Sequence, residues 1–369
     1  MNDLDPRTAD SLRTYGFNSD QQSRWQEKVR SGVFAQANNL VQGPLSAPPA
    51  GSMHSLPEPG SDDWKELEAI GLDAMARGEF AVCVLNGGMA TRFGGVVKGV
   101  VEVRDGRSFL GMAIDNANDL RKRSGGRVRV FLMNSFATDD ATKQHFAEHK
   151  DFGYPAADIE HFTQFVALRM AEDGELFRLD NGEPSPYGPG HGDFDSAFRA
   201  SGCLQRFLDD GGKYVFVRNV DNLGALGSPA VLGHHIQSGK QMTAEQTKKR
   251  AGDVGGAPYL FDERVQLVEQ LRFPAGFDAS IVDVFNTNTM TFTAEALLQP
   301  RELGRYFVKK KVEGRAAVQI EHLIGELTAH LTTNFLAVPR DGTASRFLPI
   351  KTPDDLTTAR PEIDQIYGS

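Results

Sequence analysis

The stretch that most constrains this chain is a glycine-rich loop between two apolar runs, residues 81–103, which read AVCVLNGGMATRFGGVVKGVVEV. The first run is apolar from Ala81 to Leu85 and stops at Asn86, which predicts a buried strand that ends in a loop. The second run, residues 99–103, is rich in valine and predicts another strand. Directly after a core strand, the chain is thus expected to have a flexible backbone that a ligand can approach closely.

The loop itself favours an anionic ligand. Glycines let the backbone approach a ligand and point N–H groups at it, and this loop has Gly87, Gly88, Gly94 and Gly95. Arg92 and Lys98 add two cationic side chains, so phosphate oxygens are the expected guest. The pattern is not a P-loop, because Lys98 is followed by Gly99, and Met89 and Ala90 break a dinucleotide fingerprint.

A helix and a strand are expected after the loop. Apolar residues recur at helical spacing from Phe109 to Leu120, and residues 127–133 read as a strand. A strand, a helix and a strand in this order imply a right-handed crossover and a mainly parallel sheet. We therefore expect an α/β fold whose ligands lie at the carboxyl ends of the strands, where the glycine loop begins.

The N-terminal sixty residues have a different character. Residues 18–20 offer helix caps, and apolar residues recur every four positions from Trp25 to Val33. Residues 43–61 are dense in proline and glycine and lack periodicity, which predicts a surface linker. Another helix is expected from residue 61 or 62 to Gly78.

Composition excludes several classes of partner. The formal net charge of -9 argues against nucleic acid or an anionic membrane surface as the main partner. No apolar run approaches the length of a membrane span and the first residues lack a signal pattern, so a cytoplasmic location is expected. The two cysteines, Cys83 and Cys203, do not form a disulfide framework.

Two later stretches carry polar residues in places suited to a ligand. Residues 186–193, PYGPGHGD, predict a rigid turn in which Gly190 and Gly192 permit close approach of a base or phosphate beside His191. Residues 213–224 predict a strand that delivers Asp221 at its carboxyl end, where one carboxylate suits Mg²⁺ bridging phosphates. From the residues alone, a structural turn histidine and a helix-capping or turn aspartate are the more frequent interpretations.

The glycine loop resembles the loop G-G-x-G-T-R-x-G-x-x-x-P-K of sugar-1-phosphate nucleotidylyltransferases, and its opening Leu-Asn-Gly-Gly resembles the UDP-sugar pyrophosphorylase family. Ala90 stands where that family has glycine, and Lys98 lacks the preceding proline and lies one residue closer to the glycines. Further family motifs follow in the same order: P-x-G-H-G-D near residue 190, N-x-D-N-L-G-A at 219–225, R-V-Q-L-x-E at 264–269, F-N-T-N at 285–288 and F-L-P-V-K near 351.

The resemblance implies a role for each matching residue. It places the nucleotide against Leu85, Gly87, Gly88, Gly190, His191 and Asn219. It places the sugar against Gly256, Glu269, Asn286 and Asn288. It assigns charge stabilisation at the reacting phosphates to Arg92, Lys98 and Lys351, and the Mg²⁺ ion to Asp221.

The resemblance also implies a fold and a reaction. The expected fold is a Rossmann-like, GT-A-like nucleotidyltransferase of three layers with a mixed, mainly parallel sheet. The expected reaction is attack of a sugar 1-phosphate on the α-phosphorus of an NTP, with pyrophosphate leaving, and UTP with glucose 1-phosphate as substrates. That nucleophile is already an anion, so positioning and charge neutralisation suffice.

Two alternatives stay open. The departures in the glycine loop, and Thr289-Met290-Thr291 after the F-N-T-N motif, also fit an amino-sugar or cyclitol 1-phosphate, or GTP as the nucleotide. The second alternative is a binding protein for nucleotide sugars that does not catalyse. The sequence leaves the base, the sugar and the oligomeric state open.

The resemblance covers residues 80–357. We expect a helical segment and linker over 1–60, the nucleotidyltransferase catalytic domain over 61–351 and a short tail over 352–369. Many family members carry a further C-terminal β-helical domain, and its oligomerisation or regulation is expected to be absent here.

Overall fold

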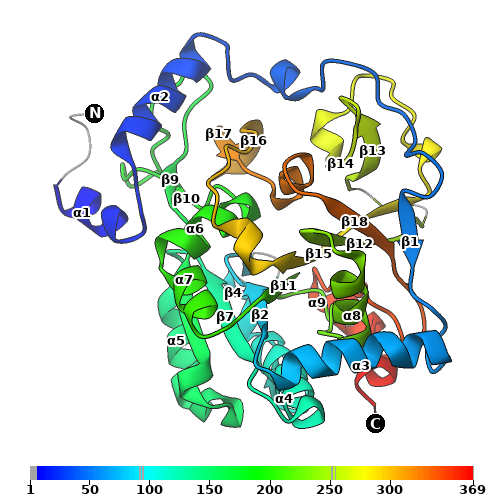
Figure 1. Ribbon diagram of the computed structural model, residues 1–369. Coiled ribbons are helices and arrows are strands. Elements are labelled where there is room, and N and C mark those ends of the chain that lie inside the picture. The colour runs from blue at the N-terminus through cyan, green and yellow to red at the C-terminus, as the bar shows by residue number, and fades with distance from the viewer. Residues whose placement is uncertain (1–5, 91–92, 94, 251, 254, 369) are drawn as a thin grey trace.

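A computed structural model describes residues 6–90, 93, 95–250, 252–253 and 255–368. Its centre is an eight-stranded sheet. The strands lie in the order β1 (Met53–Ser55), β18 (Thr333–Ala337), β12 (Met242–Lys248), β15 (Val284–Thr293), β11 (Tyr214–Asn219), β2 (Phe80–Leu85), β7 (Arg129–Asn134) and β8 (Ile159–Thr163) (Figure 1). Within this sheet β15 runs antiparallel to both neighbours and the other pairings are parallel. The expected mixed, mainly parallel sheet is confirmed.

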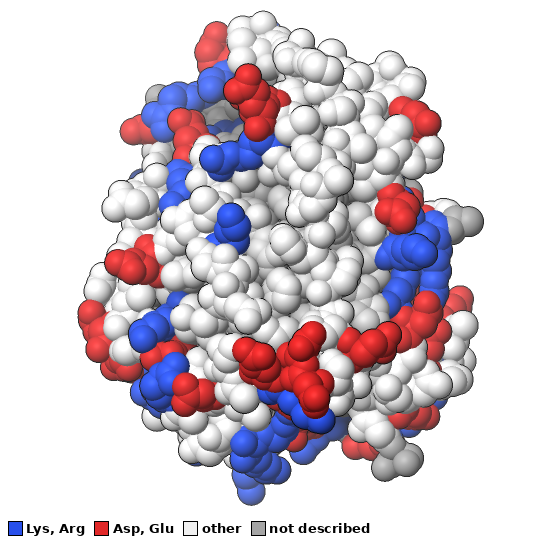
Figure 2. Space-filling view, turned by 45° about the vertical axis from the view of Figure 1, so that its right-hand side comes forward, with Lys and Arg blue, Asp and Glu red and all other residues white. Residues whose placement is uncertain are grey.

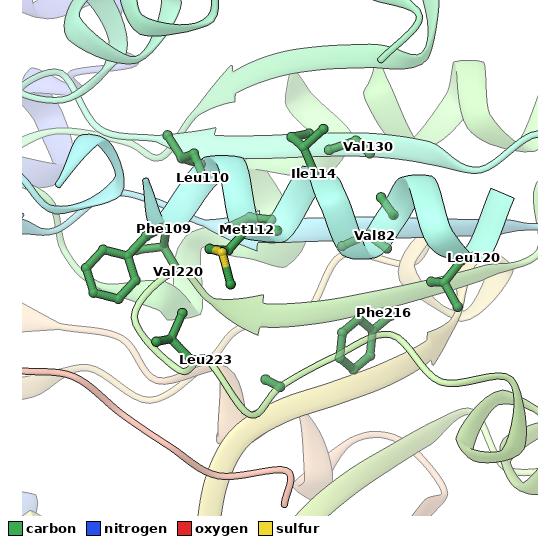
Figure 3. Close-up of a cluster of buried hydrophobic side chains, with 14 of the residues drawn as sticks. Val82, Phe109, Leu110, Met112, Ile114, Leu120, Val130, Phe216, Val220 and Leu223 are labelled. Carbon is green, nitrogen blue, oxygen red and sulfur yellow. The ribbon is translucent and has the colours of Figure 1, made fainter. Parts of the chain in front are cut away.

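Helices cover both faces of the sheet because β2 and its neighbours are apolar on both sides. Val82 and Val84 belong to the core beneath α4 (Phe109–Ser124), as Figure 3 shows for Val82 with Leu110 and Ile114 of that helix. The alternate residues of β2, such as Cys83, pack with residues of α6 and α7 on the opposite face. The remaining helices of the layers are α3 (Asp62–Ala76), α5 (Asp139–Glu148), α6 (Phe194–Ala200), α7 (Cys203–Asp209) and α8 (Pro229–Ser238).

The reversed strand β15 matters for the site. Val217 of β11 pairs with Met290 of β15, so the first residues of β15 lie where β11 and β2 end. The antiparallel direction of β15 therefore brings residues 285–288 to the same edge of the sheet as the glycine loop.

Smaller sheets surround that edge. They are β3 (Met89–Ala90) with β4 (Val96–Val97), β5 (Glu102–Arg104) with β6 (Arg107–Ser108), β9 (Ala167–Leu168) with β10 (Pro186–Tyr187), β13 (Ala257–Phe261) with β14 (Arg264–Val268) and β16 (Tyr306–Val312) with β17 (Arg315–Glu321). In Figure 1 the last two pairs lie above the central sheet.

The second strand expected at residues 99–103 is not formed as predicted. Residues Lys98–Val100 form a 3₁₀ turn, and only the short β5 follows. Gly99 packs so closely that an added Cβ would lie 2.2 Å from Asn86 Oδ1, and Phe109 N donates to the Val101 carbonyl. Val103 thus joins the core below α4, and Val101 packs against that core, instead of forming a long strand.

The segments expected to be a surface linker and a short tail both contain secondary structure that packs against the rest of the protein. Residues 43–61 contain the edge strand β1, which the flanking prolines hid. Helix α1 spans Pro6–Thr14, and α2 (Ser19–Arg30) is fastened by the Gln22 amide, which donates to Leu168 O and accepts from Leu168 N at 3.0 Å each. At the other end, α9 (Pro353–Thr358) and α10 (Arg360–Tyr367) follow, with Ile363 fully buried.

Candidate active site

The glycine loop begins at a buried anchor. Asn86 directly follows β2 and its Nδ2 donates to Asn134 Oδ1 at 3.0 Å and to Thr142 Oγ1 at 2.8 Å. These bonds pair the two N–H groups of the buried amide and fix the direction in which the chain leaves the sheet. Gly87 and Gly88 therefore start from a defined position.

Gln164 lies between two of the sequence motifs. A Cβ added to Gly87 would lie 2.6 Å from Gln164 Nε2, and one added to Gly188 would lie 2.2 Å from the same atom. A methyl group at either position would therefore displace the Gln164 amide from its place between the two glycines. Sequence reasoning missed Gln164; the signal that could have found it is its position directly after β8, at the carboxyl edge of the sheet.

His191 is held by the backbone of a distant turn. Its Nδ1 accepts a hydrogen bond from Ile324 N at 3.0 Å, so the ring carries its proton on Nε2. Burial lowers the pKa of His191 from 6.5 to about 4, so the ring is neutral near pH 7. A neutral ring whose Nδ1 lone pair is occupied is a positioning group and not a general base.

Gly190 and Gly192 are explained by a protein contact. Added Cβ atoms would lie 2.7 Å from His322 O at Gly190 and 2.5 Å from the backbone of His322 and Leu323 at Gly192. Gly192 N also donates to His322 O at 3.1 Å. The close approach that these glycines permit is therefore to residues 322–323, and contact of Gly190 with a nucleotide stays a prediction.

The residues expected to face the sugar form one hydrogen-bonded chain. Glu269 Oε2 accepts from Gly256 N at 3.0 Å, and Glu269 Oε1 accepts from Asn286 Nδ2 at 3.3 Å. Asn286 Oδ1 accepts from Asn288 N at 3.0 Å, and Asn288 Nδ2 donates to Asn219 Oδ1 at 2.9 Å. The structure thus brings together Gly256, Glu269, the pair Asn286 and Asn288, and Asn219, which come from separate parts of the sequence.

Two features suit this chain of polar groups to a ligand. Burial raises the pKa of Glu269, which the bonds from Asn286 and Gly256 oppose. Asn288 has the left-handed φ of 56°, and its Oδ1 is buried and accepts no hydrogen bond from the part of the chain that the structure describes. An unpaired acceptor and a strained backbone at one residue are typical of a functional site.

Of the charged residues expected at the phosphates, the structure brings Lys98 and Asp221 into contact. Lys98 Nζ lies 2.5 Å from Asp221 Oδ2, with side chains 14% and 22% exposed. The next segment is tied to the same residue, because Ile350 N donates to the Asp221 carbonyl at 2.9 Å. Lys351 follows, exposed, with its backbone N–H donating to Asp355 Oδ2 at 2.8 Å. Arg92 lies outside the described residues.

Asn222 fixes the distance between the two loops that carry Asp221 and Lys351. Its Oδ1 accepts from Leu348 N at 2.8 Å and from Gly224 N at 3.2 Å, while Arg218 Nη2 donates to its carbonyl at 2.6 Å. Arg346 in turn makes a bidentate pair with the buried Glu245 at 2.6 and 2.7 Å. These buried arginines position the loops, and sequence reasoning did not single them out.

Figure 2 shows both signs of charge interspersed around a broad uncharged area on the face in view, with no continuous basic stripe there. Among the described helices, none has the length and apolar character that crossing a membrane requires.

Comparison with known proteins identifies relatives. The family model described as UTP–glucose-1-phosphate uridylyltransferase matches residues 51–365. The proteins of that name from Hordeum vulgare and Saccharomyces cerevisiae are 32% and 31% identical; each alignment covers 79% of this chain, and 64% and 61% of the relative. This chain therefore spans less than two thirds of the length of these curated relatives.

Solved structures give the same result for the fold. A mutant UDP-glucose pyrophosphorylase from Leishmania major in complex with UDP-glucose is 25% identical with a TM-score of 0.66, covering 86% of this chain and 69% of that one. The UDP-N-acetylglucosamine pyrophosphorylase from Trypanosoma brucei shares the fold with a TM-score of 0.76 at 17% identity, covering 90% and 75%. The expected three-layer nucleotidyltransferase fold is confirmed, and the chain belongs to the UTP–glucose-1-phosphate uridylyltransferase family.

Proposed function

We propose that this protein makes UDP-glucose and pyrophosphate from UTP and glucose 1-phosphate. The observation that carries the proposal is the meeting, at one edge of the sheet, of the glycine loop, the Lys98–Asp221 pair and the polar chain from Gly256 to Asn288. Membership of the family supports the substrates, as does the complex of the Leishmania major relative with UDP-glucose.

The side-chain amide of a glutamine is the group proposed to recognise the uracil base. Uracil presents an N–H donor beside a carbonyl acceptor, and a glutamine side chain offers the matching acceptor and donor. Gln164 is held between Gly87 and Gly188, so its amide occupies a defined position next to the loop that would receive the nucleotide. We assign recognition of the base to Gln164, with Leu85, Gly88 and Asn219 alongside.

The sugar end is prepared before the substrate arrives. Amide and carboxylate groups pair with hydroxyls, and Glu269, Asn286 and Asn288 already hold one another in place. Because these bonds fix the side chains, less conformational freedom is lost when a sugar binds. The unpaired Asn288 Oδ1 then gains a partner from a sugar hydroxyl.

The phosphate end must bring two polyanions together. Lys98 and Lys351 supply positive charge, and Arg92 is proposed to act with them. Asp221 is a hard ligand of the kind Mg²⁺ prefers, and its pairing to Lys98 through Oδ2 leaves Oδ1 for a cation. When bound there, Mg²⁺ would neutralise charge on the phosphates of both substrates. Lys98 is then free to turn from Asp221 toward a phosphate.

The reaction follows from this arrangement. A phosphate oxygen of glucose 1-phosphate attacks the α-phosphorus of UTP in line, the new P–O bond forms, and the bond to pyrophosphate breaks. No proton has to be removed from the nucleophile, which agrees with the neutral and internally bonded His191. The protein contributes positioning and stabilisation of the growing charge.

A substrate panel tests the proposal. Pyrophosphate release is measured with Mg²⁺ for each of the four NTPs against glucose 1-phosphate, galactose 1-phosphate, N-acetylglucosamine 1-phosphate and a cyclitol 1-phosphate. UTP with glucose 1-phosphate should give the strongest signal. A strong signal from another pair would show that the reaction is the proposed one but that the substrates are different. No pyrophosphate release, together with binding of UDP-glucose, would indicate a binding protein.

A further inference from the structure

A second group of metal-ligating side chains lies at the C-terminal end of α5. His145, Glu148 and His149 each place one ligand atom within 4.8 Å of the others. Their spacing of three and four residues puts them on one face of the helix. From this cluster we infer a binding site for a transition-metal ion, with Zn²⁺ as the best match, separate from the Mg²⁺ proposed at Asp221.

The hydrogen bond of His149 prepares its ring for a metal. His149 Nδ1 lies 2.9 Å from the carbonyl oxygen of His145. A carbonyl can only accept, so Nδ1 carries the hydrogen and the lone pair is on Nε2. A ring N–H donated to a backbone carbonyl is the arrangement that orients histidine ligands in metal sites.

His145 has a comparable supporting contact. Its Nε2 lies 2.8 Å from Ser108 Oγ, the hydroxyl that also accepts from Gly111 N at 3.1 Å as the N-cap of α4. In the tautomer whose Nε2 donates its hydrogen to this oxygen, Nδ1 is left to bind the metal.

An aromatic side chain packs against both rings. Phe152 is stacked on His149 at 5.0 Å between centroids and 17° between planes, and lies 5.4 Å from His145. It reaches this position through a left-handed turn, with φ of 49°, 52° and 54° at Lys150, Asp151 and Phe152. Three consecutive residues with a Cβ in this region are unfavourable, so the turn is a strained feature that fixes the rings.

The ligand set selects the class of metal. Two imidazoles and one carboxylate leave a fourth position for water, which suits tetrahedral Zn²⁺, whereas Mg²⁺ takes oxygen ligands in an octahedron. A bound ion would join the end of α5 to the strained turn and, through Ser108, to the start of α4. Both helices pack against the turn that bears Lys98, so the ion would brace one wall of the glycine loop.

Metal binding is tested directly with the full chain after treatment with a chelator. Zn²⁺ is titrated in competition with a chromogenic chelator, and Co²⁺ is added separately to record its visible absorption. We expect one Zn²⁺ per chain and a Co²⁺ spectrum of tetrahedral intensity. His149→Gln and His145→Gln should each weaken Zn²⁺ binding by about tenfold or more, the scale on which even supporting groups of metal sites act.

The control is the other close pair of histidines, His54 and His234, whose ring centroids lie 6.1 Å apart. His234→Gln should leave the stoichiometry and affinity unchanged. His149 is exposed, so its replacement is compatible with folding, which circular dichroism checks. Unchanged Zn²⁺ affinity in His149→Gln, absence of stoichiometric binding, or loss of binding in His234→Gln would overturn the site.

Discussion

Lys98 Nζ and Asp221 Oδ2 lie 2.5 Å apart although 123 residues separate them in the chain. The contact joins the end of the glycine loop to the loop after β11, and it places a cation and a carboxylate where substrate phosphates are proposed to bind. Both side chains are largely sheltered from solvent, at 14% and 22% exposed, so their charges act in a medium less polarisable than water.

Replacing either partner should therefore lower kcat strongly while changing the stability of the fold much less. Lys98→Ala should lower kcat by about two to three orders of magnitude, the scale for loss of one charge-stabilising donor. Asp221→Ala should remove the response of activity to Mg²⁺. Steady-state rates over a Mg²⁺ series measure both effects. Lys309→Ala, which changes an exposed lysine paired with Glu172, is the control and should keep the parent rate.

Recognition of the base should depend on Gln164. Gln164→Glu removes the amide donor, so KM for UTP should rise about tenfold to a hundredfold, because a buried acceptor on the base would lose its partner. Gly188→Ala should act in the same direction, since the new methyl group would meet Gln164 Nε2. The exposed Gln237→Glu serves as control. An unchanged KM for UTP in both Gln164→Glu and Gly188→Ala would show that the base binds elsewhere.

The hydrogen-bonded residues at the sugar end should affect KM for glucose 1-phosphate. Asn286→Ala removes the link between Glu269 and Asn288 and should raise KM for glucose 1-phosphate by about tenfold or more, with a smaller effect on KM for UTP. Separate titrations of the two substrates measure the ratio. A larger effect on UTP than on glucose 1-phosphate would contradict the assignment.

His191 gives a prediction about pH. Its folded pKa of about 4 lies below the unfolded value of 6.5, so the unfolded state binds the proton first as pH falls. Stability due to the neutral ring is complete above pH 6.5 and is lost as pH falls toward 4, by up to about 3 kcal/mol. His191→Asn keeps an acceptor for Ile324 N and should flatten this slope. Urea unfolding between pH 4 and 7 measures it, and parallel slopes would contradict the buried neutral ring.

The C-terminal helices should be part of the folding unit. Ile363 is 0% exposed within the core that contains β2 and α4, and Tyr367 Oη donates to Leu223 O at 2.8 Å. Ile363→Ala should cost about 2–5 kcal/mol of unfolding free energy, as expected for a large-to-small change in a core. The neighbouring exposed Glu362→Ala should cost much less. Equal denaturation midpoints for the two variants would show that residues 360–367 form a loosely attached tail.

Much of the fold and the candidate site follows from short-range patterns. Ala81–Leu85 is apolar on both faces and ends at a polar residue, which identifies a central strand and the edge where ligands bind. The motifs that contain Asn286 and Asn288 also mark that edge, although only the antiparallel direction of β15 explains why they arrive there.

The parts that sequence reasoning missed depend on contacts between distant segments. Gln164 has no motif of its own, and its importance arises from packing between Gly87 and Gly188. The strand β1 is hidden by prolines and is specified by its pairing with β18. Residues 99–103 look like a strand because of their valines, yet the close packing of Gly99 turns the chain into the core.

The most direct test of the central claim is the product balance from UTP and glucose 1-phosphate. Purified protein is incubated with both substrates and Mg²⁺, and UDP-glucose and pyrophosphate are quantified in the same sample. We expect equal amounts of the two products, with both lost together in Lys98→Ala. Absence of both products from the parent protein, while UDP-glucose still binds to it, would contradict the claim that this edge of the sheet is a catalytic site.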